Sequence, residues 1–403
     1  MRIIAFIISL SITIALVIVL DLQLPVGSSR TPRLGSFLSP QHGFWQNAEN
    51  DSLGLGKDLK FAGLKGKVEV YYDDRLVPHV YADDETDAYF VQGYIHAKFR
   101  LWQMEFQTHA AAGRLSEILG EKSGETNFVA VDKFFRRLGM VYAAEKSLKE
   151  LEENSVTKTI ADAYTSGINA YINSLQSNQY PFEYKLLDYT PEPWTNLKTV
   201  LFLKYMSYDL AGAEWDFEMT NAKNIFSAED FEKIYPIIQD TLDPIIPKKT
   251  AFTRPALAVT KPLNADSVYF KMKDSLQQVF MKPDEGNGSN NWAVSGSKTK
   301  SGKPILANDP HLGLNLPALW FEMQITTPTF SSYGATFPGA PSIIIGFNDS
   351  CAWGFTNAMR DVRDYYEINF SDTTMRQYSY GGQTATSTFR KEIIKVKDIA
   401  AVS

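Results

Sequence analysis

The stretch "DEGNGSNNWAVSG" (residues 284–296) passes within two residues from glycine, asparagine and acidic residues to a strand-like Asn-Trp-Ala-Val. Ser289 lies at this junction, directly after Gly288. If the bond between them is cut, the new α-amine of Ser289, with a reference pKa of about 7.7 to 8.0, can act as general base for its own hydroxyl. Glycine before the serine favours cutting, because it adopts backbone angles that strain and expose the bond. A Gly-Ser pair alone also fits an ordinary turn.

Around this junction, a helical part of the chain is followed by a part made of strands. From Glu85 to about Ile234, apolar residues recur at spacings of three and four, which predicts helices. After the junction the period changes to two, in "WFEMQITT", "SIIIGF", "YYEINF" and "FRKEIIKVK", which predicts strands. The sequence therefore predicts an α+β fold with helices first and the sheet afterwards. The last strands arrive with no sequence left to complete the sheet, so we expect a fragment of a longer protein.

The N-terminal 27 residues predict export. The apolar run from Ile3 to Leu20 has about the minimum length that spans a bilayer, and it also fits a long signal-peptide core. No clear Ala-x-Ala site follows, so a signal peptide and a membrane anchor for residues 1–27 both stay open. Either one places the body outside the cytoplasm, in the periplasm or on the membrane. Residues 28–62, rich in Pro, Gly and Ser, predict a stalk or linker that packs aromatic side chains onto the body.

Several classes of protein are excluded by composition. The net charge is -6 without a long basic run, which argues against a nucleic-acid partner. Cys351 is the only cysteine, so an intramolecular disulfide and a thiolate-rich metal site are excluded, and we predict a buried structural role at the start of a strand. The chain has no Gly-x-Ser-x-Gly elbow, which argues against an α/β-hydrolase. Its five histidines form no His-Glu-x-x-His pair, which argues against a zinc protease.

Longer motifs around the junction resemble those of the penicillin acylase family of N-terminal-nucleophile hydrolases. "GSNNWAVSGSKTKSGKPILANDPHLGLNLPALWFEM" is similar to the start of that family's β chain, and "YGATFPGAPSIIIGFNDSCAWGFTNAMRDVRDYY" is similar to its next block. Upstream, "DDRLVPHVYADDETDAYFVQGYIHAKFRLWQM", "GRLSEILG" and "PFEYKLLDYTPEPWT" resemble its α-chain motifs. The resemblance extends over roughly residues 66–370.

The resemblance implies an αββα sandwich and a precursor that cuts itself between Gly288 and Ser289. Residues 63–260 would form the mostly helical α-chain region, residues 261–288 a connector removed on maturation, and residues 289–403 the start of the β chain. A second cut would free the connector. The α and β chains of one precursor would remain together as a heterodimer.

The resemblance also assigns roles to individual residues. Ser289 would attack an amide carbonyl while its α-amine relays the proton. His311 would lie beside the nucleophile and orient its amine or hydroxyl. The backbone N–H of Asn357 would be one oxyanion donor, and the second donor would lie beyond Ser403. The activity implied is acylase cleavage of small N-acyl amides such as penicillins or N-acyl homoserine lactones.

A metal and an acyl pocket follow from the same resemblance. Structural calcium would be bound by three carboxylates, those of Glu218, Asp361 and Asp364. Leu312, together with Ile343 or Ile345, would line the acyl pocket, and such an aliphatic lining favours fatty acyl over phenylacetyl groups.

Two alternatives belong to other functional classes. One is a membrane-anchored binding protein that keeps the acylase fold without catalysis, but such a protein has no chemical need for a serine at the cut site. The other is a metal-dependent peptidase, for which the ligand histidines are missing.

Overall fold

The computed structural model describes residues 2–26, 29–48, 55–211, 215–236, 250–251, 286–357, 363, 365–366, 368–397 and 399–402. The chain divides into two compact units. The larger unit, which we call the body, comprises Met1–Ala211, Pro283–Met359 and Thr388–Ser403, and the smaller unit comprises Gly212–Lys282 and Arg360–Ser387.

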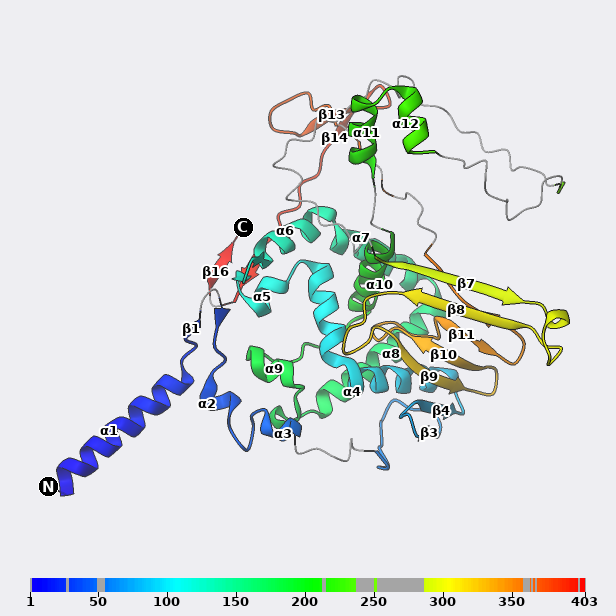
Figure 1. Cartoon of the computed structure of the whole chain (residues 1–403). Helices are drawn as coiled ribbons and strands as arrows, with labels where there is room; N and C mark the ends of the chain where they lie inside the picture. Colours follow the sequence, from blue (N-terminus) through cyan, green and yellow to red (C-terminus); the bar gives the residue numbers. More distant parts are fainter. Residues whose placement is uncertain are drawn as a thin grey trace. The chain divides into compact units, whose positions relative to one another are not determined.

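The body is built on a six-stranded sheet whose strands come from both sides of the junction (Figure 1). Its order is β12-β11-β10-β9-β4-β3, and every neighbouring pair is antiparallel except β4 and β9, which are parallel. The strands are β3 (Val68–Tyr72), β4 (Pro78–Ala82), β9 (Phe321–Thr326), β10 (Ser331–Thr336), β11 (Ile345–Asn348) and β12 (Ala352–Trp353). The predicted order of helices first and sheet afterwards is thus incomplete, because the β3–β4 hairpin precedes the helices and joins the later strands.

The longest helix, α4 (Glu85–Ala112), covers one face of this sheet. It begins because the Asp84 side chain accepts from the backbone N–H groups of Thr86 and Asp87, and it ends at Gly113, whose φ of 62° is left-handed. Phe90 and neighbouring apolar residues of α4 pack on Val80 of β4 and on alternate residues of β9. The main core therefore contains residues from both sides of the junction.

Further helices surround α4, and the predicted α+β class is confirmed. In the body they are α5 (Leu115–Leu119), α6 (Phe128–Leu138), α7 (Met140–Glu153), α8 (Ser155–Ser174), α9 (Phe182–Leu187) and α10 (Asn196–Ala211). The N-terminal part contributes α1 (Arg2–Asp21), α2 (Leu34–Phe37) and α3 (Trp45–Ala48). The smaller unit holds α11 (Asp216–Ile225), α12 (Ala228–Ile234) and the hairpin of β13 (Gln377–Tyr380) and β14 (Gln383–Thr386).

Some local sequence predictions differ from the structure. In the predicted strand "YYEINF", Phe370 alone among the described residues pairs, in an isolated bridge with Tyr378. The predicted strand "FRKEIIKVK" shortens to β15 (Ile394–Val396), which pairs with β16 (Ile399–Val402). The prediction that Cys351 is buried was wrong, since its side chain is exposed before the short strand β12. The apolar residues that follow Cys351 suggested a buried strand. The strand that they form, β12, lies at the edge of the sheet, where it is less covered.

A chain of buried hydrogen bonds joins α4, α8 and the sheet through His96. The N–H of Gly339 donates to Tyr164 Oη, and Tyr164 Oη lies 2.7 Å from His96 Nδ1. His96 Nε2 lies 2.9 Å from Thr336 Oγ1, which donates to the carbonyl of Phe321. These partners are all satisfied when His96 is neutral with its proton on Nε2. Burial, helped by the charge of Arg100, lowers the pKa of His96 to about 3.

We expect this histidine to make the fold acid-sensitive. Because the folded pKa of His96 lies below the unfolded value of about 6.5, its effect on stability is absent above pH 6.5 and grows as the pH falls toward 3. At pH 5 the loss should be about 2 kcal/mol. Urea unfolding of wild type and His96→Gln at pH 7 and pH 5 checks this, since the stability difference between them should shrink by that amount. A difference independent of pH would contradict it.

Candidate active site

The junction at Ser289 begins a long β-hairpin. Strand β7 (Gly288–Val294) pairs antiparallel with β8 (Ile305–His311), placing Gly288 opposite His311 and Ser289 opposite Pro310. The start of a strand at the Gly-Ser junction agrees with the change of period in the sequence. The hairpin fixes the backbone on both sides of the bond predicted to be cut.

The hydroxyl of Ser289 points at the carbonyl that precedes it. Its Oγ donates a hydrogen bond to the carbonyl oxygen of Gly288, and the residue is half-buried. A hydroxyl in this position lies next to the carbonyl carbon of the same peptide group. The arrangement is therefore chemically suited to attack on the Gly288–Ser289 bond.

His311 flanks that peptide bond from the neighbouring strand. An ideal Cβ placed on Gly288 would lie 3.9 Å from His311 Nδ1. The other ring nitrogen, Nε2, lies 3.0 Å from Asp309 Oδ2, and this contact orients the imidazole ring. The structure thus brings three of the predicted residues together: Gly288, Ser289 and His311.

Two asparagine side chains are held at the end of α10. Asn287 Nδ2 donates to the carbonyl of Asp209 at 3.2 Å, and Asn357 Nδ2 donates to the adjacent carbonyl of Leu210. The last carbonyl groups of a helix lack partners within the helix, so they are available as acceptors. The end of α10 therefore holds the residue before Gly288 near Asn357, the predicted oxyanion donor.

The segment leading to Asn357 also contacts the hairpin directly. Asn308 Nδ2 donates to the carbonyl of Phe355 at 3.1 Å. An ideal Cβ on Gly354 would lie only 2.2 Å from Asn308 Oδ1, so a larger residue here would displace the Asn308 side chain. Asn287, Asn308 and the end of α10 were not predicted from the sequence. The sequence hints at these contacts only through the asparagines that flank the junction and through the Trp353-Gly354 pair before Asn357.

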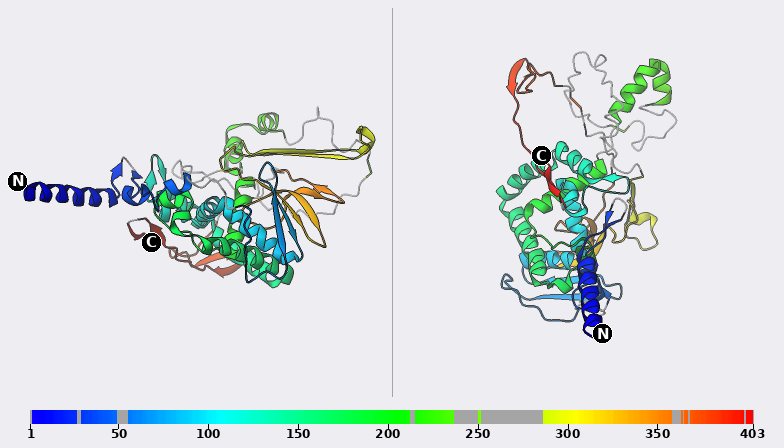
Figure 2. Two further views of the ribbon diagram at one scale, coloured as in Figure 1. Left: turned by 90° about the horizontal axis from the view of Figure 1, so that it is seen from below. Right: turned by 90° about the vertical axis from the view of Figure 1, so that its left-hand side faces the viewer.

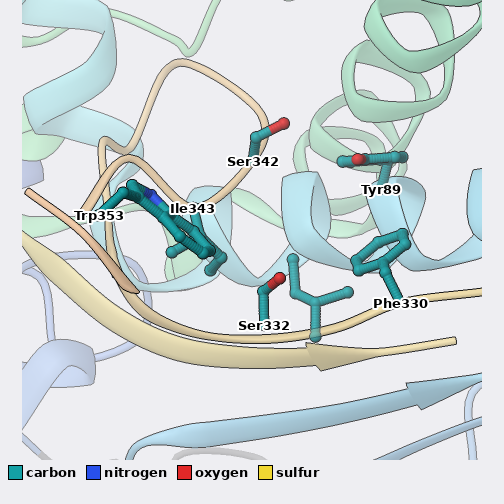
Figure 3. A pocket seen from close by; sticks show the side chains of 7 residues that line it. Tyr89, Phe330, Ser332, Ser342, Ile343 and Trp353 are labelled. Carbon is teal, nitrogen blue, oxygen red and sulfur yellow. The ribbon is translucent and has the colours of Figure 1, made fainter. Parts of the chain in front are cut away.

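The two isoleucines proposed for the acyl pocket lie on opposite faces of the sheet. Ile343 packs over Gly346 and lines a cavity of about 160 Å³ on the α4 face, with Tyr89 and Phe330 facing Trp353 across Ser332 (Figure 3). Ile345 is adjacent to Gly346 in β11 and therefore points to the other face. Neither Ser289 nor Leu312 lines this cavity, and the place of Ile345 in an acyl pocket stays a prediction.

Ser342, at the rim of this cavity, has a strained backbone. Its φ is 80°, in the left-handed region that favours glycine. The buried side chain of Gln92 holds it there, accepting from the Ser342 N–H at 2.9 Å and donating to its carbonyl at 3.2 Å.

We expect Ser342→Gly to stabilise the protein by about 1 kcal/mol, because relief of strain exceeds the entropy that glycine adds to the unfolded chain. Chemical denaturation checks this. Ser332→Gly, on strand β10 of the same cavity wall, is the control and should destabilise. A loss of stability in Ser342→Gly would show that the Ser342 side chain itself is required.

The calcium prediction stays a prediction. Glu218 is exposed on α11, whereas Asp361 and Asp364 lie outside the described residues.

One group of potential metal ligands occurs in the described part of the body. Atoms of Glu105, His109 and Glu192 lie within 4.8 Å of one another. Lys198 Nζ lies 3.1 Å from Glu192 Oε2 and Arg114 Nη2 lies 2.6 Å from Glu192 Oε1, so two cations already pair with Glu192. Glu105 accepts hydrogen bonds from the Tyr184 hydroxyl and the Glu192 N–H. His109 is also not the oxygen ligand that calcium prefers. These residues form an ion-pair network between α4 and the segment before α10, and they do not fit a calcium site.

Comparison with known proteins shows the family to which the chain belongs. The model of the family described as penicillin amidase matches residues 67–403. The chain belongs to the penicillin amidase family. Membership agrees with the resemblance found in the motifs and with the αββα fold class that it implied.

The family includes relatives with different acyl substrates in their names. The chain is 30% identical over 347 residues to penicillin acylase 2 proenzyme from Pseudomonas sp. (strain SE83), covering 85% of this chain and 43% of that protein. It is 28% identical over 307 residues to acyl-homoserine lactone acylase QuiP from Pseudomonas aeruginosa, covering 75% and 34%. A solved structure of penicillin G acylase from Alcaligenes faecalis aligns with a TM-score of 0.40 and 24% identity, over 46% of this chain and 99% of that one. The chain thus spans less than half the length of the two curated relatives, penicillin acylase 2 proenzyme and QuiP.

Proposed function

We propose that the chain is a self-processing amidohydrolase whose nucleophile is Ser289. The observation that carries the proposal is the hydrogen bond from Ser289 Oγ to the Gly288 carbonyl, with His311 on the opposite strand. In the first step Oγ bonds to the carbonyl carbon of Gly288 while the C–N bond to Ser289 breaks and the nitrogen takes a proton. Water then hydrolyses the resulting ester, leaving the Gly288 carboxylate and the free amine and hydroxyl of Ser289.

The freed terminus would then act on external amides. The α-amine of Ser289 accepts the hydroxyl proton as Oγ attacks the substrate carbonyl, and it returns the proton to the leaving amine. Water releases the acyl group from the ester. The backbone N–H of Asn357 would stabilise the oxyanion, a term worth several kcal/mol, and its attachment to α10 beside Asn287 supports that role.

Both products of the cut would stay together as the proposed heterodimer. Strand β4, from upstream of the cut, pairs with β9, from downstream, at His79–Gln324, Val80–Ile325 and Tyr81–Thr326. Salt bridges such as Arg75 to Glu322, at 3.1 Å, add further contacts across the same boundary. Dissociation would therefore require the sheet to open.

For the substrate we propose a small N-acyl amide with an aliphatic acyl chain, the class that includes N-acyl homoserine lactones and related penicillins. The half-buried side chains of Leu312, directly after His311, and of Ile345 would line the acyl pocket. We also propose that the carboxylates of Glu218, Asp361 and Asp364 bind calcium. In addition, α1 would direct export of the chain. Among the described residues, α1 alone is long and apolar enough to cross a membrane.

We expect octanoyl amides to be hydrolysed with a kcat/KM about 10-fold higher than phenylacetyl amides, because aliphatic side chains would line the pocket. Parallel assays of the two amides check this. Leu312→Phe should shift the preference toward phenylacetyl. A strong preference of the wild type for the aromatic amide would contradict the assignment of Leu312 and Ile345.

The proposed function is tested by intact mass and N-terminal sequencing of the exported protein. A fragment beginning Ser-Asn-Asn-Trp is expected. An uncut chain under folding conditions would remove the proposed base and would favour the non-catalytic binding protein instead.

A further inference from the structure

The segment that follows α1 is tied to the body at several points. We call its described residues, 22–26 and 29–48, the collar. Lys185 of α9 donates to the carbonyl of Gly43 at 3.1 Å and to Asn47 Oδ1 at 2.7 Å. Arg33 Nε lies 3.0 Å from Asp188 Oδ2, directly after α9. The collar is therefore tied to the body through α9 and the residue that follows it.

Aromatic side chains fasten the collar to α9 and remain partly exposed. Phe37 stacks on Phe44 with ring centroids 5.1 Å apart, and its edge meets Phe182 of α9 at 5.7 Å. Phe44 lies 4.3 Å from Trp45. Trp45 is 48% exposed, Leu38 45% and Phe182 41%. Contiguous exposed apolar side chains of this kind mark an interaction surface.

The collar begins at the level of the last turn of α1. An ideal Cβ on Gly35 would lie 3.6 Å from Leu20 Cβ, so α2 packs against the end of α1 next to the body (Figure 2). A 20-residue helix is about 30 Å long, which is the thickness of the hydrocarbon layer. No residue of α1 is buried in the protein. If α1 spans a bilayer, its last turn lies at the membrane boundary, and the collar lies there too.

We infer that the collar is a membrane-surface contact, and that its partner is the lipid headgroup layer on the outer side of the bilayer. Trp45, Phe182 and Leu38 would lie among the headgroups and the first acyl carbons, where tryptophan and other aromatic rings are favoured. This inference rests on the proposed export, with α1 retained. It goes beyond that proposal because the body itself, and not only α1, would contact lipid.

Tryptophan quenching in proteoliposomes tests the contact on the full chain. Phosphatidylcholine brominated near the headgroup quenches indole rings that reach the interface. No tryptophan occurs in α1, so quenching must come from other parts of the chain. We expect the brominated lipid to quench wild-type emission, and we expect Trp45→Phe to lose most of that quenching.

Trp292→Phe is the matched control, because Trp292 on β7 is 54% exposed, close to the value for Trp45. It should keep the quenching seen in wild type. Equal quenching in wild type and Trp45→Phe would overturn the lipid contact while leaving the amidase proposal intact. If the exported wild-type protein is recovered in soluble form with an N-terminus that lies after α1, α1 has been cleaved off as a signal peptide, and both the membrane anchor and the lipid contact are overturned. Loss of the Ser-Asn-Asn-Trp terminus would instead oppose the proposed function.

Discussion

Ser289→Ala is expected to leave the chain uncut and to lower amide hydrolysis on the order of 10⁴-fold or more, because in the proposed mechanism one residue supplies both nucleophile and base. Mass spectrometry of the exported protein should show the intact junction. Assays with the preferred N-acyl amide should show activity near background. The hydrogen bond from Ser289 Oγ to the Gly288 carbonyl is the structural reason, since no other side chain offers a hydroxyl at that bond in the described hairpin.

Two further variants make the Ser289 result specific. Ser295→Ala changes an exposed serine in the next turn, whose hydroxyl contacts Ser297 and no other residue in the described part of the chain, and it should cut and react normally. Ser289→Cys keeps a nucleophile of similar size and should retain part of the self-cleavage. Normal cutting of Ser289→Ala would show that another group attacks the bond, and the proposed catalytic assignment would then fail.

Gly93→Ala is expected to cost at least about 3 kcal/mol of folding stability. Gly93 of α4 faces α8, and an added Cβ would lie 2.1 Å from the backbone oxygen of Tyr164. Gly167 of α8 makes the reciprocal approach, with its Cβ position 1.8 Å from the oxygen of Phe90. Backbone atoms cannot rotate away as a side chain can, so the two helices would have to separate. Urea denaturation, or the yield of folded protein if the variant is too unstable, measures the loss.

Gly63→Ala is the control for this substitution. Among the residues that the structure describes, no atom beyond the two chain neighbours lies within 4 Å of a Cβ placed on Gly63, so its effect should stay within about 0.5 kcal/mol. Equal stability of Gly93→Ala and wild type would show that α4 and α8 tolerate a wider crossing than the structure has.

The sequence predicts the elements of this fold better than their partners. Helix α4 could be predicted because its start and end signals, Asp84 and Gly113, are local. The pairing of β4 with β9 could not, because strands joined across more than 200 residues leave no short-range pattern. The left-handed backbone of Ser342 was hidden for a similar reason, since a distant glutamine, Gln92, imposes it.

In the candidate site, too, the local motifs could be predicted from the sequence, whereas the long-range contacts could not. The Gly288–Ser289 junction and His311 are found from short motifs, and the hairpin places them opposite each other. The attachment of Asn287 and Asn357 to α10 depends on the free carbonyls at a helix end, which no motif near the junction reports. Of the two candidate isoleucines, only strand alternation in the folded sheet separates Ile345 from Ile343.

The parallel pairing of β4 with β9 would have a thermodynamic consequence if the chain is cut as proposed. In the uncut chain the two strands belong to one molecule, and the melting temperature does not depend on protein concentration. In the cut form they would belong to two chains, so unfolding would release two independent particles and become a dissociation governed by mass action. Dilution would then lower the melting temperature of the mature form alone. Maturation at Ser289 would thus exchange a unimolecular folding equilibrium for a bimolecular one, although the sheet itself remains the same.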